Sequence, residues 1–257
     1  MSLHILLPVV AGLLGLVIGS YLNVVIHRLP RGLSTVTPRS SCPACGAPIR
    51  ARDNVPLVSW LLLGGRCRAC GAPISWRYPA IEAVTALLFV ACAVRFGPTP
   101  AAAAAALFCA LMVALAAIDA EHLILPDRLT LPGIAAGLLL APWVAGLGFL
   151  DALFGALLGA GLLLALWGGW YLLRREEGMG LGDVKMLALI GAFLGVKGVL
   201  VALFFAALSG ALAGLALMWR KGVGLKAKLP FGAFLALGGI VSLFAGRPLA
   251  DWYLRLL

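Results

Sequence analysis

Long runs of apolar residues dominate this chain and decide what it can fold into. A helix needs about 20 apolar residues to cross the hydrocarbon core of a bilayer, and the chain has several runs of about that length. The runs cover residues 3–26, 80–97, 100–118, 127–146, 149–173, 184–196, 198–219 and 230–246. Hydrophobic residues make up 63% of the chain and charged residues only 12%, which no soluble globular protein needs. The sequence therefore predicts an all-α polytopic membrane protein.

The number of membrane-spanning helices depends on the shorter runs. The run at 184–196 is short and flanked by glycines, so it is either a partial helix or continuous with its neighbour. We therefore expect about eight transmembrane helices, with six as the alternative. The first run can span a bilayer and follows no basic segment, so we expect it to be the first helix and not a cleaved signal.

The positive residues gather on one side of this predicted topology. If the runs cross the membrane one after another, 16 of the 20 Lys and Arg residues lie on the same side of the membrane as residues 27–78. The other side holds Arg95, Lys197, Arg247 and Arg255. Because cytoplasmic segments carry the excess of Lys and Arg, the N-terminus is predicted outside and residues 27–78 in the cytoplasm.

The formal net charge of +10 follows from the same asymmetry. It favours contact with anionic membrane lipids. Nucleic-acid binding is not expected, because the aromatic stacking residues and the solvated basic face that would support it are missing.

Two aspartates lie at the edges of apolar runs. Asp119 ends the run that starts at residue 101, and Asp183 opens another in the string GMGLGDVKMLALIGAFLG. A carboxylate in a membrane helix costs about 2.5–3.5 kcal/mol, so such residues usually serve a function. The predicted topology places both at the cytoplasmic ends of their helices, which suggests paired carboxylates for general acid–base chemistry. Alternatively, each aspartate caps a helix end in the headgroup region.

Four of the six cysteines form two CxxC pairs in the predicted cytoplasmic segment. The pairs sit in a repeat, CPACGAPI at 42–49 and CRACGAPI at 67–74, in which a glycine follows each pair. Two such turns can place four thiolates around one ion, so a structural zinc site is predicted. Disulfides and a redox pair are the alternatives, and a cytoplasmic location disfavours disulfides. The predicted ligands are Cys42, Cys45, Cys67 and Cys70.

Further polar residues are candidates for substrate binding or support of the site. Glu82 lies one turn into an apolar run, as either a substrate-facing acid or a charge near a helix N-terminus. Lys185 could tune the Asp183 carboxylate, bind a substrate carboxylate or phosphate, or anchor the helix at the cytoplasmic face. Asp127 follows a proline as a helix start does, and a supporting role beside Asp119 is open. Gly180 and Gly182 keep the backbone next to Asp183 slim.

Six motifs occur in a fixed order along nearly the whole chain. They are GSYLNVVIHRLPRG at 19–32, the twin CxxC segment, RYPAIEAVTALLF at 77–89, IDAEHLILPD at 118–127, the GxGD motif at 180–183 and KLPFGAFLALGG at 228–239. In this order the set resembles the bifunctional type IV prepilin peptidases, the leader peptidase/N-methyltransferases of bacterial pilus and type II secretion systems.

The resemblance implies an intramembrane aspartyl protease of the GxGD class, with Asp119 and Asp183 as its catalytic pair. It also implies cleavage of prepilins or pseudopilins after a glycine, at the cytoplasmic face of the bacterial inner membrane. Methylation of the new N-terminal residue with S-adenosylmethionine would follow, and the cysteine loop would bind zinc. The chain departs from the family pattern at two positions, with Glu121 in place of an aspartate and Ala233 in place of a proline.

The resemblance divides the chain into three predicted parts. These are a first transmembrane helix (1–26), a cytoplasmic zinc loop (27–78) and a transmembrane peptidase core (79–257). The methyltransferase activity rests on the family alone, because no GxGxxG follows a predicted strand. Alternatives are a peptidase without methyltransferase activity, a transporter that uses intramembrane acids, and a noncatalytic scaffold whose zinc loop binds a partner.

Overall fold

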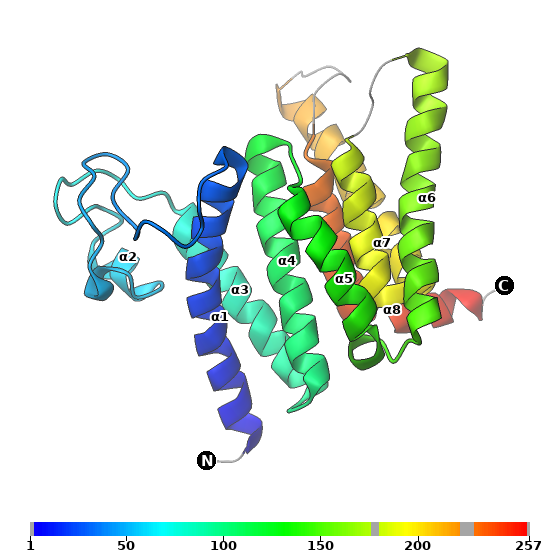
Figure 1. Ribbon diagram of the computed structural model, residues 1–257, viewed down its shortest axis with the longest axis horizontal. Helices are drawn as coiled ribbons and strands as arrows, with labels where there is room; N and C mark the ends of the chain where they lie inside the picture. Colours follow the sequence, from blue (N-terminus) through cyan, green and yellow to red (C-terminus); the bar gives the residue numbers. More distant parts are fainter. Residues whose placement is uncertain (1–2, 176–179, 222–228, 256–257) are drawn as a thin grey trace. The chain divides into compact units, whose positions relative to one another are not determined.

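The computed structural model describes residues 3–175, 180–221 and 229–255, which form helices and no strand within these ranges. Gly178 and Met179 of the glycine-rich motif, and Lys226 and Lys228 of the charge pattern, lie outside the described residues. Figure 1 shows the long helices side by side within each part of the chain. Their bounds are α1 Leu3–Arg28, α3 Arg77–Phe96, α4 Pro100–His122, α5 Asp127–Val144, α6 Phe149–Arg174, α7 Leu181–Lys221 and α8 Phe231–Leu254, and the short helix α2 is Val58–Leu62.

Six helices in the described part of the chain are long and apolar enough to cross a membrane: α1, α3, α4, α6, α7 and α8. The prediction of an all-α polytopic membrane protein is confirmed, and the six candidates count α7 as one helix although it contains a kink at Gly195. Helix α5 covers the predicted run at 127–146 but is not among the six. Helix α7 contains both of the runs predicted at 184–196 and 198–219.

Helix α7 folds back on itself at Gly195. This glycine has φ 69° and ψ −171°, which is not a helical conformation and which other residues rarely adopt. A Cβ atom placed on Gly191 would lie 2.8 Å from Cγ2 of Val199. Residues eight apart in a straight helix are separated by about 12 Å along the axis, so the segments 181–194 and 196–221 must pack against each other. The two segments are visible in Figure 1 as the yellow and light-orange parts of α7.

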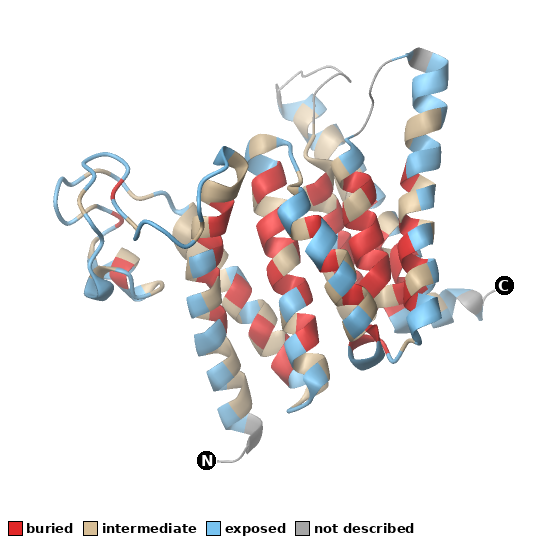
Figure 2. Cartoon of the chain, in the orientation of Figure 1, coloured by how far each residue is buried: buried red, intermediate tan, exposed pale blue. Residues whose placement is uncertain are grey.

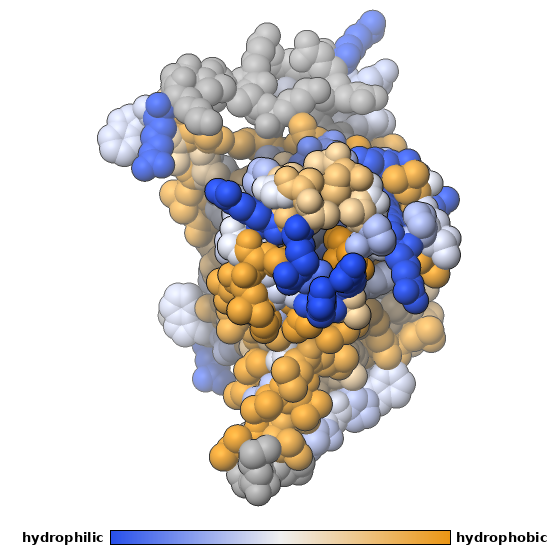
Figure 3. Space-filling model, turned by 90° about the vertical axis from the view of Figure 1, so that its left-hand side faces the viewer, coloured by the Kyte–Doolittle hydropathy of each residue, from blue (hydrophilic) through white to orange (hydrophobic). Residues whose placement is uncertain are grey.

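The chain divides into two compact units, residues 1–114 and 115–257. In the first unit, α1 packs on α3 through two glycines, because a Cβ on Gly15 would lie 2.6 Å from the Cα of Ala86 and one on Gly19 2.7 Å from the Cα of Glu82. Figure 3 shows hydrophilic side chains gathered over the cysteine loop and an apolar surface along α1. The predicted boundaries at residues 26/27 and 78/79 stay a prediction.

In the second unit, α7 packs against α5, α6 and α8. The helices approach each other so closely that their backbones are in contact. A Cβ on Gly155 of α6 would lie 2.5 Å from the carbonyl oxygen of Gly191, and a Cβ on Gly238 of α8 would lie 2.1 Å from the carbonyl oxygen of Ala202. Small residues allow this close approach of helices in lipid. The segment 181–194 is the most deeply buried part of this unit, and its buried residues appear red in Figure 2. Asp183 therefore begins the segment of the unit that packing holds most firmly.

Candidate active site

The carboxyl groups of Asp119 and Asp183 come from different helices of the second unit. Asp119 lies in the last turn of α4 and Asp183 in the first turn of α7. Their residues are only 5% and 8% exposed. A charge on Asp119 disfavours a second charge on Asp183. Two buried carboxyl groups that interact in this way can share acid and base roles.

The N-terminus of α8 closes one side of Asp119. The backbone N–H of Ala233 donates a hydrogen bond of 3.0 Å to Oδ2 of Asp119. A Cβ on Gly232 would lie 3.0 Å from the same oxygen, so only glycine fits there without displacing the carboxylate. The alanine at 233 departs from the family pattern, and it supplies an N–H group that proline lacks.

The turn between α4 and α5 places Leu125 against two glycines of the site. Leu123 adopts φ 54° and donates its N–H to the carbonyl oxygen of Asp119 at 2.9 Å, which ends α4. Two residues later, the Leu125 side chain reaches the positions where Cβ atoms on Gly182 and Gly232 would lie, at 2.8 and 3.0 Å. Leu125 thus connects the GxGD backbone of α7 to the start of α8.

The two glycines of the GxGD motif have different surroundings. A Cβ on Gly182 would lie 2.8 Å from Cβ of Leu125, so the packing leaves no room for a side chain there. A Cβ on Gly180 would lie 3.9 Å from Oδ2 of Asp183, at an ordinary contact distance. Gly182 is therefore required by packing, and Gly180 keeps space open beside the carboxylate.

Lys185 and Asp127, both predicted to bind substrate or support the site, bind each other. The Lys185 Nζ lies 2.6 Å from Oδ1 of Asp127, and the lysine and aspartate side chains are 35% and 56% exposed. Asp127 is the first residue of α5, where a carboxylate also interacts favourably with the helix dipole. The ion pair connects the start of α5 to the first turns of α7. A contact of either residue with substrate stays a prediction.

The two CxxC segments of the first unit fold into the same turn twice. In the first, the N–H of Cys42 donates to Ala47 O at 2.9 Å and the N–H of Gly46 to Cys42 O at 2.8 Å. In the second, the N–H of Cys67 donates to Ala72 O at 2.8 Å and that of Gly71 to Cys67 O at 2.9 Å. Gly46 and Gly71 share a φ of 72°, which explains the glycine after each pair.

The four cysteine sulfur atoms could hold one metal ion. The Sγ atoms of Cys42, Cys45, Cys67 and Cys70 all lie within 4.8 Å of one another, with 3.9 Å between those of Cys42 and Cys70. A tetrahedral zinc ion with Zn–S bonds of about 2.3 Å separates its sulfur ligands by about 3.8 Å, so the cluster fits zinc.

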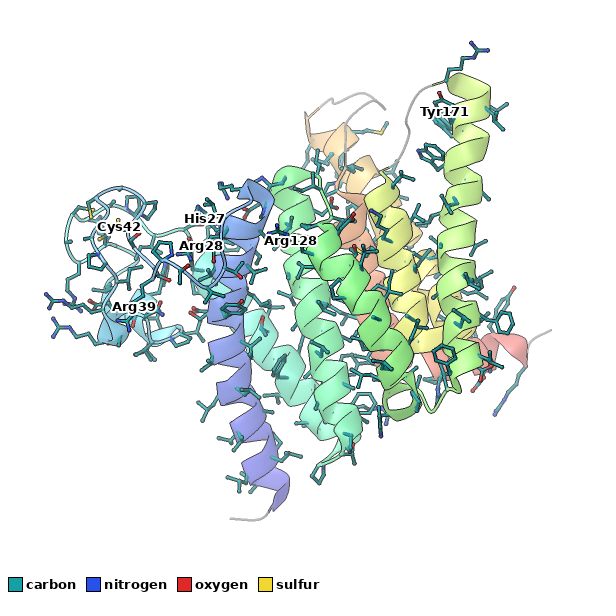
Figure 4. The ribbon with its side chains drawn as sticks, viewed as in Figure 1. His27, Arg28, Arg39, Cys42, Arg128 and Tyr171 are labelled. Atoms are coloured by element: carbon teal, nitrogen blue, oxygen red, sulfur yellow. The ribbon has the colours of Figure 1, made fainter. Side chains whose placement is uncertain are left out.

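Backbone N–H groups favour the thiolate form of one of the four cysteines, Cys42. Hydrogen bonds from the N–H groups of Cys45 and Ala44 lower the pKa of the Cys42 thiol to about 7. This favours the thiolate form, which is the form that binds metal. Figure 4 shows Cys42 in the loop that follows His27 and Arg28 at the end of α1.

Glu82 holds the cysteine loop to the membrane helices of the first unit. Its Oε2 accepts a hydrogen bond of 2.8 Å from the N–H of Leu57. Glu82 is 7% exposed, and the hydroxyl of Ser20 on α1 also bonds to its carboxylate. Leu57 has φ 60°, an unfavourable value for leucine, so this bond fixes a strained turn just before α2. The substrate-facing role of Glu82 stays a prediction.

The sequence did not reveal every residue that shapes the site. Ala233 acts through its backbone and Leu125 through packing, so neither has a side chain that indicates a role. The available signal was their position: Leu125 lies inside the IDAEHLILPD string and Ala233 inside KLPFGAFLALGG. Leu57 lies in no motif, and only the structure shows its bond to Glu82.

Comparisons with known proteins match both parts of the chain. The model of the bacterial peptidase A24 N-terminal domain matches residues 13–96, and that of the type IV leader peptidase family matches residues 106–215. The prepilin leader peptidase/N-methyltransferase of Aeromonas hydrophila is 41% identical over 94% of this chain and 92% of its own length. The proteins of the same name from Burkholderia pseudomallei (strain 1026b) and Pseudomonas aeruginosa (strain PAO1) are 41% and 38% identical. They match over 91% and 95% of this chain and 84% and 92% of their own lengths. No solved structure gives a significant match.

Proposed function

The chain belongs to the type IV leader peptidase family, and we propose that it removes the leader peptide from type IV prepilins or pseudopilins and then methylates the new N-terminus. The observation that carries the proposal is the pair of buried carboxyl groups of Asp119 and Asp183, which we propose as the catalytic residues. A transporter or a scaffold does not require such a pair.

The proposed hydrolysis follows from the chemistry of two neighbouring carboxyl groups. Two like charges in a buried site cannot both form cheaply, so one group is charged and the other protonated. The charged group takes a proton from a water molecule, whose oxygen attacks the scissile carbonyl carbon. The protonated group donates its proton to the carbonyl oxygen and stabilises the tetrahedral intermediate.

The backbone around Asp183 suits an extended peptide substrate. Among the described residues other than its chain neighbours, only Gly182 N and Oδ2 of Asp183 would lie within 4 Å of a Cβ on Gly180, so a strand-like segment could approach the carboxyl group there. Both aspartates lie at helix ends, so the scissile bond would lie at the membrane surface, next to the apolar helix of a prepilin. We therefore propose a substrate with a short polar leader followed by an apolar helix.

We propose that the aspartates face the cytoplasm from the bacterial inner membrane. The support is the charge asymmetry, which leaves only four Lys and Arg residues on the opposite side. Trp167 and Tyr171 stack with their ring centroids 5.7 Å apart in the last turns of α6, and Figure 4 marks Tyr171 there. Aromatic residues of this kind prefer the boundary between lipid and water, next to basic residues such as Arg175.

Zinc and a methyl donor complete the proposal. Cys42, Cys45, Cys67 and Cys70 would hold a zinc ion, whose role would be to keep the loop folded. S-adenosylmethionine would supply the methyl group for the new N-terminal amine, as the N-methyltransferase part of the relatives' names suggests. The partners are prepilin substrates and membrane lipids, and nucleic acid is not expected.

Cleavage of a prepilin peptide by the purified protein tests this function. The wild type should release the leader, and in the presence of S-adenosylmethionine the mature product should gain the mass of one methyl group. Asp119→Asn and Asp183→Asn should abolish cleavage while the metal content stays the same. Asp151→Asn is a matched control, because Asp151 only accepts a bond from the N–H of Gly148 (3.3 Å) at the start of α6. Normal cleavage by either site variant would contradict the proposal.

A further inference from the structure

Asp119 takes the place of the missing capping side chain of α8. An N-cap side chain normally accepts hydrogen bonds from the N–H groups of the second and third helical residues. The residue at the N-cap of α8 is Pro230, whose side chain makes no such bond. The second and third residues are Gly232 and Ala233, and both donate to the Asp119 carboxylate, Ala233 at 3.0 Å. A carboxylate from α4 thus caps a helix that lies more than a hundred residues further along the chain.

This position favours a negative charge on Asp119. The unpaired N–H groups at a helix N-terminus carry the equivalent of about half a positive charge, and anions bind there. Helix α8 is 24 residues long and has no acidic residue in its first turn, so no neighbouring side chain of that turn competes with Asp119. Hydrogen bonds to charged groups are also stronger than those to neutral groups.

Asp183 has fewer donors among the described residues. Its carboxylate accepts one backbone hydrogen bond, from Gly180, and its own N–H donates to the carbonyl oxygen of Gly180 at 3.1 Å. Asp183 also lies near a helix N-terminus, that of its own helix α7, so the helix dipole favours a negative charge on both aspartates and does not distinguish them. Within residues 3–175, 180–221 and 229–255, the number of backbone N–H donors differs: Ala233 and Gly232 donate to the Asp119 carboxylate, and Gly180 donates to that of Asp183.

We propose that the N-terminus of α8 divides the catalytic roles, so that Asp119 carries the charge and activates water while Asp183 holds the proton. This inference rests on the proposed peptidase function. Ala233 and Gly232 are positioning residues in it, because they act on substrate only through Asp119.

The proposed division fixes the path of each proton. A water O–H proton moves to Asp119 as the water oxygen bonds to the scissile carbonyl carbon. The carbonyl π electrons move to its oxygen, which takes the proton of Asp183. In the second step, Asp119 returns its proton to the leaving nitrogen as the C–N bond breaks. Asp183 regains a proton from a hydroxyl group of the intermediate, so the site ends as it began.

Two chemical probes distinguish a charged carboxylate from a protonated one. A carboxylate anion opens an epoxide by attacking its carbon, and the ring oxygen then takes a proton from water. A carboxylic acid reacts with a diazoacetyl compound by protonating the diazo carbon, after which the carboxylate displaces dinitrogen. Each reaction leaves an ester that peptide mass spectrometry assigns to one residue.

The wild-type protein in detergent should form the epoxide ester on Asp119 and the diazoacetyl ester on Asp183. Reversed labels, or equal labelling of both residues by either probe, would overturn the inference. The cleavage assay separates this failure from failure of the proposed function. If the wild type cuts the prepilin peptide but shows reversed labels, only the division of roles is wrong.

Variants at residue 233 test the backbone donor itself. Ala233→Pro removes the N–H group, and proline is tolerated in the first turn of a helix. This variant should lose the preference of the epoxide for Asp119 and should lower kcat roughly 10- to 150-fold, the loss of one hydrogen bond to a charged group. KM should change little, because in this proposal Ala233 acts on the substrate only through Asp119. Ala233→Val keeps the N–H and should keep the epoxide label on Asp119, and an unchanged labelling pattern in Ala233→Pro would contradict the role of this donor.

Discussion

The contact between α6 and α7 predicts a specific steric effect at Gly155. A Cβ on this residue would lie 2.5 Å from the carbonyl oxygen of Gly191 and 2.6 Å from the Cα of Gly195. Both neighbours are backbone atoms that cannot turn aside, so Gly155→Ala must push the two helices apart. Overpacking of this kind costs about 1–3 kcal/mol.

Gly161→Ala on the same helix is the matched control. A Cβ on Gly161 would have no atom within 4 Å, so this variant changes only the helix propensity. Alanine is more favourable than glycine in a helix by about 1 kcal/mol, and both variants share this gain. The difference between them therefore isolates the cost of separating α6 from α7.

Thermal unfolding of the purified variants in detergent measures this difference. A change of 1 kcal/mol shifts Tm by about 2–4 °C in a protein of this size, so Gly155→Ala should melt roughly 2–12 °C below Gly161→Ala. The contact between α6 and α7 also fixes the position of the segment 181–194, whose first turn carries Asp183. The Gly155→Ala variant should therefore cleave prepilin more slowly than the wild type. Equal melting temperatures for the two variants would refute the backbone contact.

Three further predictions concern the site and the cysteine loop. Gly182→Ala should lower kcat, because its Cβ would lie 2.8 Å from Cβ of Leu125 and would displace that side chain. Gly180→Ala should mainly raise KM, because its Cβ narrows the path of the substrate to Asp183. Steady-state kinetics measure both constants, and equal effects of the two variants on kcat and KM would contradict this. Glu82→Ala should destabilise the loop by about 1–3 kcal/mol, because it leaves the half-buried N–H of Leu57 without its acceptor, and Glu82→Gln should do so much less. Limited proteolysis of the loop measures this, and equal sensitivity of the two variants would show that the charge matters instead. The zinc affinity of the metal-free protein should fall as the pH drops, because the metal must displace the protons of the thiols. Although the N–H of Ala72 lowers the pKa of Cys70, the neighbouring cysteines and desolvation raise this pKa more, to about 11, so the fall begins above neutral pH. It should become steeper below about pH 7, where the Cys42 thiolate is protonated too. Competition with a chelator measures this affinity, and a value that does not change with pH would contradict a thiolate site.

The sequence was sufficient to predict the fold class, because apolar runs of bilayer length admit few structures. It also predicted the cysteine cluster, since two CxxC turns in a repeat place four sulfurs around one point. It also indicated Asp119 and Asp183 as candidates, because a carboxylate at the edge of an apolar run is costly enough to suggest a function; their catalytic role stays a prediction.

The reversal of α7 illustrates what the sequence could not define. The glycines around residues 191–198 indicated a short or interrupted helix, but Gly195 could equally have served as a packing residue in a straight one. The reversal depends on the contact between Gly191 and Val199, and no pattern in the neighbouring sequence indicates this tertiary contact. Helix α5, which covers one of the predicted membrane runs, is not among the six candidates, because its polar first turn, with Asp127 and Arg128, and its prolines at 132 and 142 lower its mean hydropathy.

Contacts made by the backbone were also beyond prediction. The N–H of Ala233 reaches Asp119 whatever the side chain at 233 is, as long as it is not proline. The hydrogen bond from Leu57 to Glu82 depends on a turn of the cysteine loop that no sequence motif predicts. The ion pair of Lys185 with Asp127 was not predicted, because opposite charges 58 residues apart in the sequence give no indication of contact.

The central claim is that the carboxyl groups of Asp119 and Asp183 act as one catalytic unit. The most direct test is the residual cleavage rate of Asp119→Asn, Asp183→Asn and the double variant, measured on the same prepilin peptide. Residues that act together are strongly non-additive, so the double variant should be no slower than either single variant. A double variant slower by the product of the two single effects, or substantial cleavage by either single variant, would contradict the account.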